Sequence, residues 1–274
     1  MVKFNNKLLG IAVAGMLAAG PVGAVTFGTS ADGTGMSLND ILNNITTKNR
    51  TPACDESLGD TCSTSVDMIN DQVSGDAYWQ VEATGGSVST IVIEVAGNAG
   101  KNTFGIFDKA DETNTLQLFD GLAGATDQVT LSVATTVHGD YQFSAGGTTK
   151  IFGGDTFGYY LSGPGGKFYS DSNKNLFGDD QMVAYQGKGT RGQDYLEYGN
   201  GIITRKGWWT SASYMLGWED LPVNTFGTNG GSDKDYQDFV VLVESIVPVP
   251  APATLALLGL GLLGIGYSAR RKTA

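Results

Sequence analysis

Short hydrophobic or alternating runs recur about every ten residues between residues 76 and 247. Gly, Asn, Asp and Ser separate these runs, and turn residues of this kind commonly bound β-strands. No stretch of comparable length in this region shows helical periodicity. The pattern predicts an all-β domain over residues 76–247, a β-sandwich of jelly-roll-like type. The clearest expected strands are Tyr78–Ala83, Ser89–Ala96, Phe104–Asp108, Leu116–Phe119, Gln128–Ala134, Tyr141–Ser144, Thr156–Ser162 and Phe239–Ser245.

Residues 25–75 follow a different pattern. Four hydrophobic residues there recur at helical spacing, so that their side chains would lie on one face of a short helix. Ser37 precedes them and could cap the first turn. We therefore expect a short N-terminal helical subregion before the β-domain, with its hydrophobic face formed by Leu38, Ile41, Leu42 and Ile45.

The first residues have the layout of an export signal. Lys3 and Lys7 precede an uncharged run over residues 8–19, and the small residues of Val22–Ala24 follow it. A basic start, a short apolar run and a small-residue cleavage site are the three parts of a signal peptide. We predict a signal peptide over residues 1–24, cut by signal peptidase, with an uncleaved anchor as the alternative.

The last residues combine prolines, an apolar run and a basic end. The apolar run over residues 253–269 would reach about 26 Å as a helix, which is enough for a thin bilayer. It is apolar on every face, unlike an amphipathic core helix. We expect a transmembrane helix whose basic end lies in the cytoplasm and whose body lies outside.

This C-terminal order closely resembles the PEP-CTERM sorting signal of Gram-negative bacteria. In that family a membrane transpeptidase-like exosortase reads and removes the tail, and delivers the body to the cell surface or the extracellular polymer. The resemblance implies an exported protein that is anchored in the inner membrane only transiently. One position departs from the motif, because Ala251 stands where its name has Glu. The residues that carry the resemblance, within 248–274, are Pro248, Pro250, Ala251, Pro252, Arg270, Arg271 and Lys272.

The chain has two cysteines, Cys54 and Cys62, both in the N-terminal subregion. In an exported protein an even pair at this spacing predicts a disulfide. A cysteine-ligated metal and a pair of free thiols are the alternatives, although a metal would need two further ligands.

The charges further limit the function. The chain has 28 acidic and 17 basic residues, and five of the basic residues lie at the extreme ends, outside the body. Such an acidic body repels phosphate backbones, so we expect no nucleic-acid partner. His138 is the single histidine, which argues against a multi-histidine metal site. It lies between expected strands without a nucleophile-elbow motif, so we interpret it as a surface-turn residue.

The densest acidic cluster lies just before the last expected strand. Asp233, Asp235 and Asp238 follow Gly231 and lead into a hydrophobic run. Their carboxylates could converge on one Ca²⁺ ion, which takes 6–8 oxygen ligands. Alternatively, these side chains form Asx turns or cap backbone amides. The sequence leaves both interpretations open.

A second candidate Ca²⁺ loop contains Asp171, Asn173 and Asn175, whose spacing imitates the start of an EF-hand. The rest departs from that motif, because Leu176 occupies the Gly position and Met182 the final Glu position. An EF-hand is therefore rejected, and a looser Ca²⁺ loop stays open.

The body also resembles surface proteins that carry the domain of unknown function DUF4114. The resemblance covers about residues 77–246 and includes Tyr-Trp-Gln-Val-Glu-Ala-Thr-Gly-Gly at 78–86 and Asn-Thr-Phe-Gly-Ile-Phe-Asp at 102–108. It is most specific in its last thirty residues, where Gln237 replaces the Asn that is common in that family. The resemblance implies a β-rich surface module with a capacity for Ca²⁺, without an established activity.

Two further patterns suggest carbohydrate chemistry. Trp208, Trp209 and Trp218, with Tyr214 between them, could stack on sugar rings if exposed, or belong to the core if buried. A carboxylate pair such as Glu197 and Glu219 could serve a glycosidase, in which the separation of the two groups decides the mechanism.

These patterns together favour an exported, non-enzymatic β-sandwich protein of the cell surface or extracellular matrix, stabilised by Ca²⁺. Extracellular polysaccharide is an expected partner in such a location. The alternatives are a secreted carbohydrate-binding module and a carbohydrate-active enzyme with paired carboxylates.

Overall fold

The computed structural model describes residues 38–46, 66–82, 85–94, 100–190, 194–223 and 231–249. The predicted signal peptide, Cys54 with Cys62, and the sorting segment from Pro250 onward lie outside these ranges. The described ranges contain two facing β-sheets, a β-hairpin and one α-helix.

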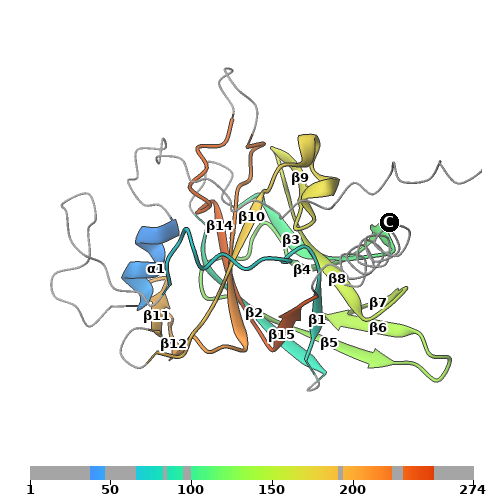
Figure 1. Ribbon diagram of the computed structural model, residues 1–274. Helices are drawn as coiled ribbons and strands as arrows, with labels where there is room; N and C mark the ends of the chain where they lie inside the picture. Colours follow the sequence, from blue (N-terminus) through green and yellow to red (C-terminus); the bar gives the residue numbers. More distant parts are fainter. Residues whose placement is uncertain are drawn as a thin grey trace, which may run out of the picture. The chain divides into compact units, whose positions relative to one another are not determined.

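A six-stranded antiparallel sheet forms one layer of the domain (Figure 1). Its strand order is β15-β1-β8-β3-β4. The remaining strand, β9, pairs with the end of β8 opposite to the part that pairs with β1. The strands are β1 (Trp79–Val81), β3 (Thr103–Asp108), β4 (Asp111–Phe119), β8 (Thr156–Gly163), β9 (Gly166–Tyr169) and β15 (Ile246–Pro248).

A seven-stranded antiparallel sheet forms the second layer, in the order β10-β13-β14-β2-β5-β6-β7. Its register shifts between Val240 and Val241, where β14 pairs with β2. The strands are β2 (Gly86–Glu94), β5 (Gln128–Thr135), β6 (Tyr141–Ala145), β7 (Thr148–Phe152), β10 (Met182–Gln186), β13 (Ser213–Trp218) and β14 (Phe239–Glu244).

Aromatic side chains from both sheets fill the space between the layers. Phe104 of β3 stacks on Tyr159 of β8, with their ring centroids 5.3 Å apart. From the opposite sheet, Trp218 and Phe239 contact the same phenylalanine at 5.9 and 5.3 Å. The core between two facing sheets confirms the predicted all-β sandwich. The eight expected strands correspond to β1–β6, β8 and β14.

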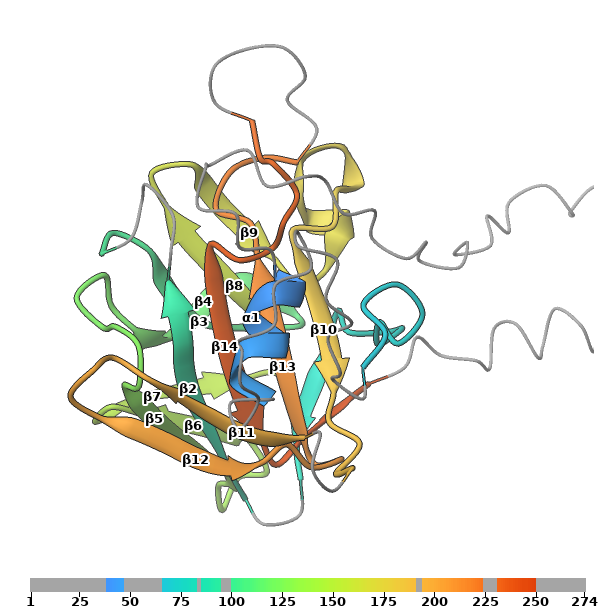
Figure 2. The same cartoon turned by 90° about the vertical axis from the view of Figure 1, so that its left-hand side faces the viewer.

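A second core covers the outer face of the seven-stranded sheet. It lies under α1 (Leu38–Thr46) and the hairpin of β11 (Tyr195–Gly199) and β12 (Thr204–Trp208), as Figure 2 shows. The predicted helix is confirmed, and its four hydrophobic residues are buried in this core. Successive strand side chains point to opposite faces, so β14 is hydrophobic throughout because both of its faces are covered.

Candidate cation site

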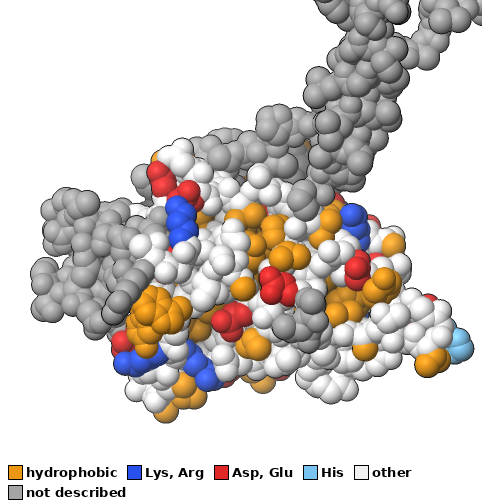
Figure 3. All heavy atoms as spheres, turned by 60° about the horizontal axis from the view of Figure 1, so that its bottom comes forward, with side chains coloured by type: hydrophobic (Ala, Val, Ile, Leu, Met, Phe, Trp, Pro, Cys, Tyr) orange, Lys and Arg blue, Asp and Glu red, His pale blue; other side chains and the backbone are white. Residues whose placement is uncertain are grey.

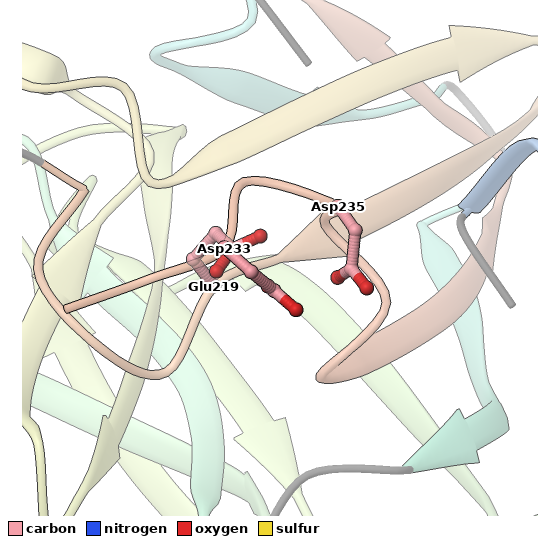
Figure 4. Close-up of side chains that lie close together, drawn as sticks. All are labelled: Glu219, Asp233 and Asp235. Carbon is pink, nitrogen blue, oxygen red and sulfur yellow. The ribbon is translucent and has the colours of Figure 1, made fainter. Parts of the chain in front are cut away.

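Three carboxylates gather where β13 ends and the loop before β14 passes over it (Figure 4). Glu219, Asp233 and Asp235 each offer an oxygen that lies within 4.8 Å of the others. Glu219 and Asp235 have 0% of their surface exposed, whereas Asp233 is half-buried. A metal ion at this point would have ligands from two separate segments of the chain.

The backbone of the 231–238 loop has an unusual conformation. Lys234 and Tyr236 have left-handed φ angles of 62° and 56°. This conformation is unfavourable for side chains other than Gly, by about 1–2 kcal/mol per residue. The Tyr236 side chain compensates because it is buried in the second core and its hydroxyl donates to the Asp180 carbonyl at 2.8 Å. At the same loop, the Leu38 amide of α1 donates to the Asp235 carbonyl.

Two donors of the loop orient Glu219. The Tyr236 amide donates to its Oε1 at 2.6 Å, and the Ser232 hydroxyl donates to its Oε2. The Lys234 amide donates to the same Ser232 oxygen at 2.9 Å. Glu219 therefore links the end of β13 to the loop that carries the other two carboxylates.

Burial and mutual repulsion make it costly to charge this site. Burial, with the nearby charges of Asp235 and Asp233, raises the pKa of Glu219 to about 7, although the hydrogen bonds from Ser232 and Tyr236 lower it. Burial, with Glu219 and Asp220 nearby, raises the pKa of Asp238 to about 9. A bound proton or a bound cation can relieve this cost.

Asp238, the third residue of the predicted Ca²⁺ cluster, does not belong to the group of three. Its Oδ2 accepts a hydrogen bond from the Asp220 amide at 2.9 Å, and Asp220 in turn accepts one from the Asn102 side chain. Asp235 also accepts from the amide of Gln237, two residues further on. In this segment Asp233 and Asp235 thus lie at the cluster, whereas Asp238 caps an amide.

Glu219 is the member of the cluster that the calcium prediction omitted. It lies fourteen residues before Asp233 and sixteen before Asp235, and the sequence singled it out only in a candidate carboxylate pair with Glu197. The available signal was its position, because Glu219 and Asp220 directly follow the hydrophobic strand that ends at Trp218.

In the second candidate loop, Asp171 acts as a helix cap. Its Oδ1 accepts from the amide of Asn173 at 3.1 Å, at the start of the short 3₁₀ helix η2 (Ser172–Lys174). Its Oδ2 accepts from the Tyr78 hydroxyl at 2.6 Å, and the Asn173 side chain donates to Oδ1. Both oxygens of Asp171 are thus hydrogen-bonded to nearby groups.

Asn175 of the same loop connects two segments. Its Oδ1 accepts from the Tyr169 amide, and its Nδ2 donates to the carbonyls of Tyr169 and Asp179, all at 2.8 Å. It lies between η2 and the second 3₁₀ turn, η3 (Leu176–Gly178). The side chain holds the end of β9 against the chain that leads to β10.

Most of the aromatic cluster belongs to the core. Trp209, Trp218 and Tyr214 are buried, and only Trp208 is exposed among the four, at 46%. Its ring meets that of Tyr195 edge to face, at a centroid distance of 5.2 Å and an angle of 79°. Of the two alternatives for this cluster, burial in the core therefore applies to all of its members except Trp208.

The other polar candidates lie apart from the cluster. Glu197 is on the β11–β12 hairpin and forms an ion pair with Lys206 at 3.2 Å. His138 is exposed in the turn between β5 and β6. On the face drawn in Figure 3, the described acidic and basic side chains are scattered among hydrophobic and polar ones, without a continuous basic surface.

The comparisons with known proteins concern the C-terminal end of the chain. The PEP-CTERM protein-sorting motif matches residues 248–272. The motif implies an exported protein that is anchored at the membrane before processing and is sorted by an exosortase-type enzyme. Searches of curated proteins and of solved structures found no significant match. None of the helices in the described ranges has the length and apolar character needed to cross a bilayer.

Proposed function

We propose that the body of this exported protein is a non-catalytic module of the cell surface or extracellular matrix, stabilised by one Ca²⁺ ion at Glu219, Asp233 and Asp235. The observation that carries the proposal is the approach of these three carboxylates to within 4.8 Å, two of them without exposed surface. Burying a carboxylate costs several kcal/mol, and a nearby like charge adds to that cost. A cation would convert this repulsion into coordination.

The donor set favours Ca²⁺ over softer metals. All three ligands are carboxylate oxygens, without His or Cys, which is the chemistry of a hard cation. Oxygens bound to one Ca²⁺ ion lie 2.3–2.6 Å from it, so they are at most about 5 Å apart. The observed spacing fits this limit. The DUF4114-like motifs at 218–238, which include all three residues, also support this assignment.

The burial of Glu219 argues against a glycosidase that uses the candidate pair. A general acid or nucleophile must touch the sugar, and a side chain with 0% exposure cannot do so in this conformation. Glu197 is engaged with Lys206 on a separate hairpin. A structural role for Glu219 requires no access from outside.

Melting curves of the exported protein, with Ca²⁺ and with a chelator, test the proposal. Binding to the folded state alone adds about 2.7 kcal/mol of stability when Ca²⁺ is present at one hundred times its Kd. We expect Glu219→Gln and Asp235→Asn to lose this response, because each removes one charge from the cluster while preserving shape.

The matched control is Asp111→Asn, which removes the same charge at the exposed start of β4, where Asp111 accepts from the Thr113 amide. This variant should keep the full response to Ca²⁺. Equal destabilisation of Asp235→Asn with Ca²⁺ and with chelator would assign the residue to capping alone.

A further inference from the structure

The sorting signal begins inside the folded body. The motif match starts at Pro248, and Pro248 is the last residue of β15. In the antiparallel pair with β1, it lies opposite Trp79, and Val247 lies opposite Gln80. One residue later, the Val249 amide donates to the Tyr78 carbonyl at 2.8 Å. The first two residues of the signal are therefore held in the sheet.

The two ends of β15 are held differently. Ile246 has no exposed surface and lies in the core between the sheets, whereas Val247 is 37% exposed. Pro248 and Val249 are half-buried. Beyond Ile246, the strand is thus held mainly by backbone hydrogen bonds, which places it among the segments that open most easily.

A corner fixes the chain just before β15. Ser245 joins β14 of one sheet to β15 of the other, with a left-handed φ of 58°. Its amide donates to the Ala212 carbonyl at 2.8 Å, and its carbonyl accepts from the Glu82 amide. With Ile246 buried next to it, this corner can stay in place while the residues beyond it detach.

While β15 is paired with β1, its free edge is a poor site for an enzyme that binds its substrate as an added strand. On either side of β1, the Ser245 carbonyl accepts from the Glu82 amide and the Val249 amide donates to the Tyr78 carbonyl. These bonds place Val247 in a hydrogen-bonded pair, so its polar groups face β1. Pro248 falls between those pairs, so its backbone position faces the open edge, where proline offers no N–H. An enzyme that takes an extended peptide by strand addition lacks a donor at this position.

The distance to the membrane adds a second constraint. Only residues 250–252 separate Val249 from the apolar run that we expect to enter the membrane, and three extended residues span at most about 11 Å. With β15 docked, the chain between the sheet and this run is therefore short.

We propose that residues 247–249 detach from β1, hinging at Ile246, to present the Pro-rich motif to the membrane sorting enzyme. The folded body would thus control access to its own sorting signal. The proposal rests on the sorting motif and on the pairing of β15, and is independent of the cation at Glu219.

A disulfide across the pair tests the proposal in the full-length chain, in cells that carry the cognate exosortase. Gln80 and Val247 lie in a hydrogen-bonded pair, where Cα atoms are about 5.5 Å apart, a separation that a disulfide can bridge. We expect Gln80→Cys with Val247→Cys to abolish processing, so that the precursor accumulates on a gel. Each single-cysteine variant should be processed as the wild type is.

A spacer distinguishes loss of access from loss of folding. Inserting about eight Gly and Ser residues between Val249 and Pro250 adds a flexible reach of roughly 16 Å. The locked chain with this spacer should be processed again, because the motif is then accessible while β15 stays docked. Normal processing of the locked chain without the spacer, with the disulfide verified by mass spectrometry, would overturn the proposal. Failure of the spacer to restore processing would also overturn it.

Discussion

Two polar loops of this protein were predicted from sequence to bind Ca²⁺, and their structures differ. The 171–175 loop has Asp or Asn at every second position, and the 233–238 loop has Asp at 233, 235 and 238. In the later loop, Asp233 and Asp235 approach a third carboxylate, Glu219, from another strand. In the earlier loop, Asp171 meets the neutral hydroxyl of Tyr78. The comparison shows that the long-range partner decides what such a loop does.

The chemistry of that partner explains the difference. Tyr78 remains a hydrogen-bond donor, because burial and then its bond to Asp171 raise the pKa of its hydroxyl. The Asp171 charge is thereby satisfied within the protein. Glu219 instead brings a further carboxylate to its loop, and its pKa is raised first by burial and then by Asp235 and Asp233. The proposed cation site therefore lies at the later loop, where three carboxylates meet.

The largest expected effect is on the pH dependence without Ca²⁺. The pKa of Glu219 rises from 4.5 to about 7 on folding, so between these values the folded protein binds more protons than the unfolded chain. Stability must therefore fall as pH rises through this window, by up to about 3 kcal/mol. Thermal melting in chelator should give a lower midpoint at pH 8 than at pH 5.

Glu219→Gln is the matched control because glutamine resembles the protonated side chain. Its stability should fall less over the same pH range. Part of the slope should remain, since burial also raises the pKa of Asp76 to about 8 and that of Asp238 to about 9. Saturating Ca²⁺ should flatten the wild-type curve because it favours the ionised form. If stability changed with pH equally in the wild type and in the variant, Glu219 would be excluded as the source of the pH dependence.

The β-sandwich itself could be predicted from the local pattern of hydrophobic residues in the sequence. Eight strands and α1 were predicted because each has hydrophobic residues at the period of its own structure. The β11–β12 hairpin was missed because β12, with the sequence Thr-Arg-Lys-Gly-Trp, is mostly polar. It is a strand because of its pairing with β11 and its position over the second core. β15 was missed because three residues with a terminal proline form no recognisable pattern.

The candidate site was predictable only in part. The spacing of Asp233 and Asp235 pointed to a shared site, and their carboxylates do lie together. Nothing in the spacing could pair them with Glu219, since that contact depends on the path of the loop over the end of β13. The same limit applies to Asp171, whose partner Tyr78 lies 93 residues away in the sequence.

The next largest effect should come from Asn175, whose substitution should lower stability without changing the response to Ca²⁺. Asn175→Ala removes three hydrogen bonds to backbone groups and should destabilise the protein by about 2–3 kcal/mol. The loss should be the same with Ca²⁺ and with chelator, as measured by urea unfolding. Asn173→Ala is the control, because that exposed side chain donates only to Asp171 and should cost much less. If Asn175→Ala lost stability only in the presence of Ca²⁺, this loop would be a second cation site.

The smallest effect should come from Asp171→Asn. The side-chain oxygen of asparagine can keep the bond from the Asn173 amide, but its Nδ2 then faces Tyr78 and cannot accept from the hydroxyl. The charge-assisted bond is replaced at best by a neutral one that Nδ2 donates to the Tyr78 oxygen. We expect a loss of about 1 kcal/mol, equal with and without Ca²⁺. Tyr78→Phe removes the same bond from the other side, so the double variant should lose less than the sum of the two single losses.

This cycle tests the central point of the comparison. If Tyr78 satisfies Asp171, the two substitutions are coupled, and the coupling is unchanged by Ca²⁺ because both groups belong to the protein. If the loop instead bound Ca²⁺, Asp171→Asn would lose more stability with the ion than with chelator, while Tyr78→Phe would not. Urea unfolding of the four proteins under both conditions separates these cases, and additive losses would contradict the role of Tyr78 as the group that satisfies Asp171.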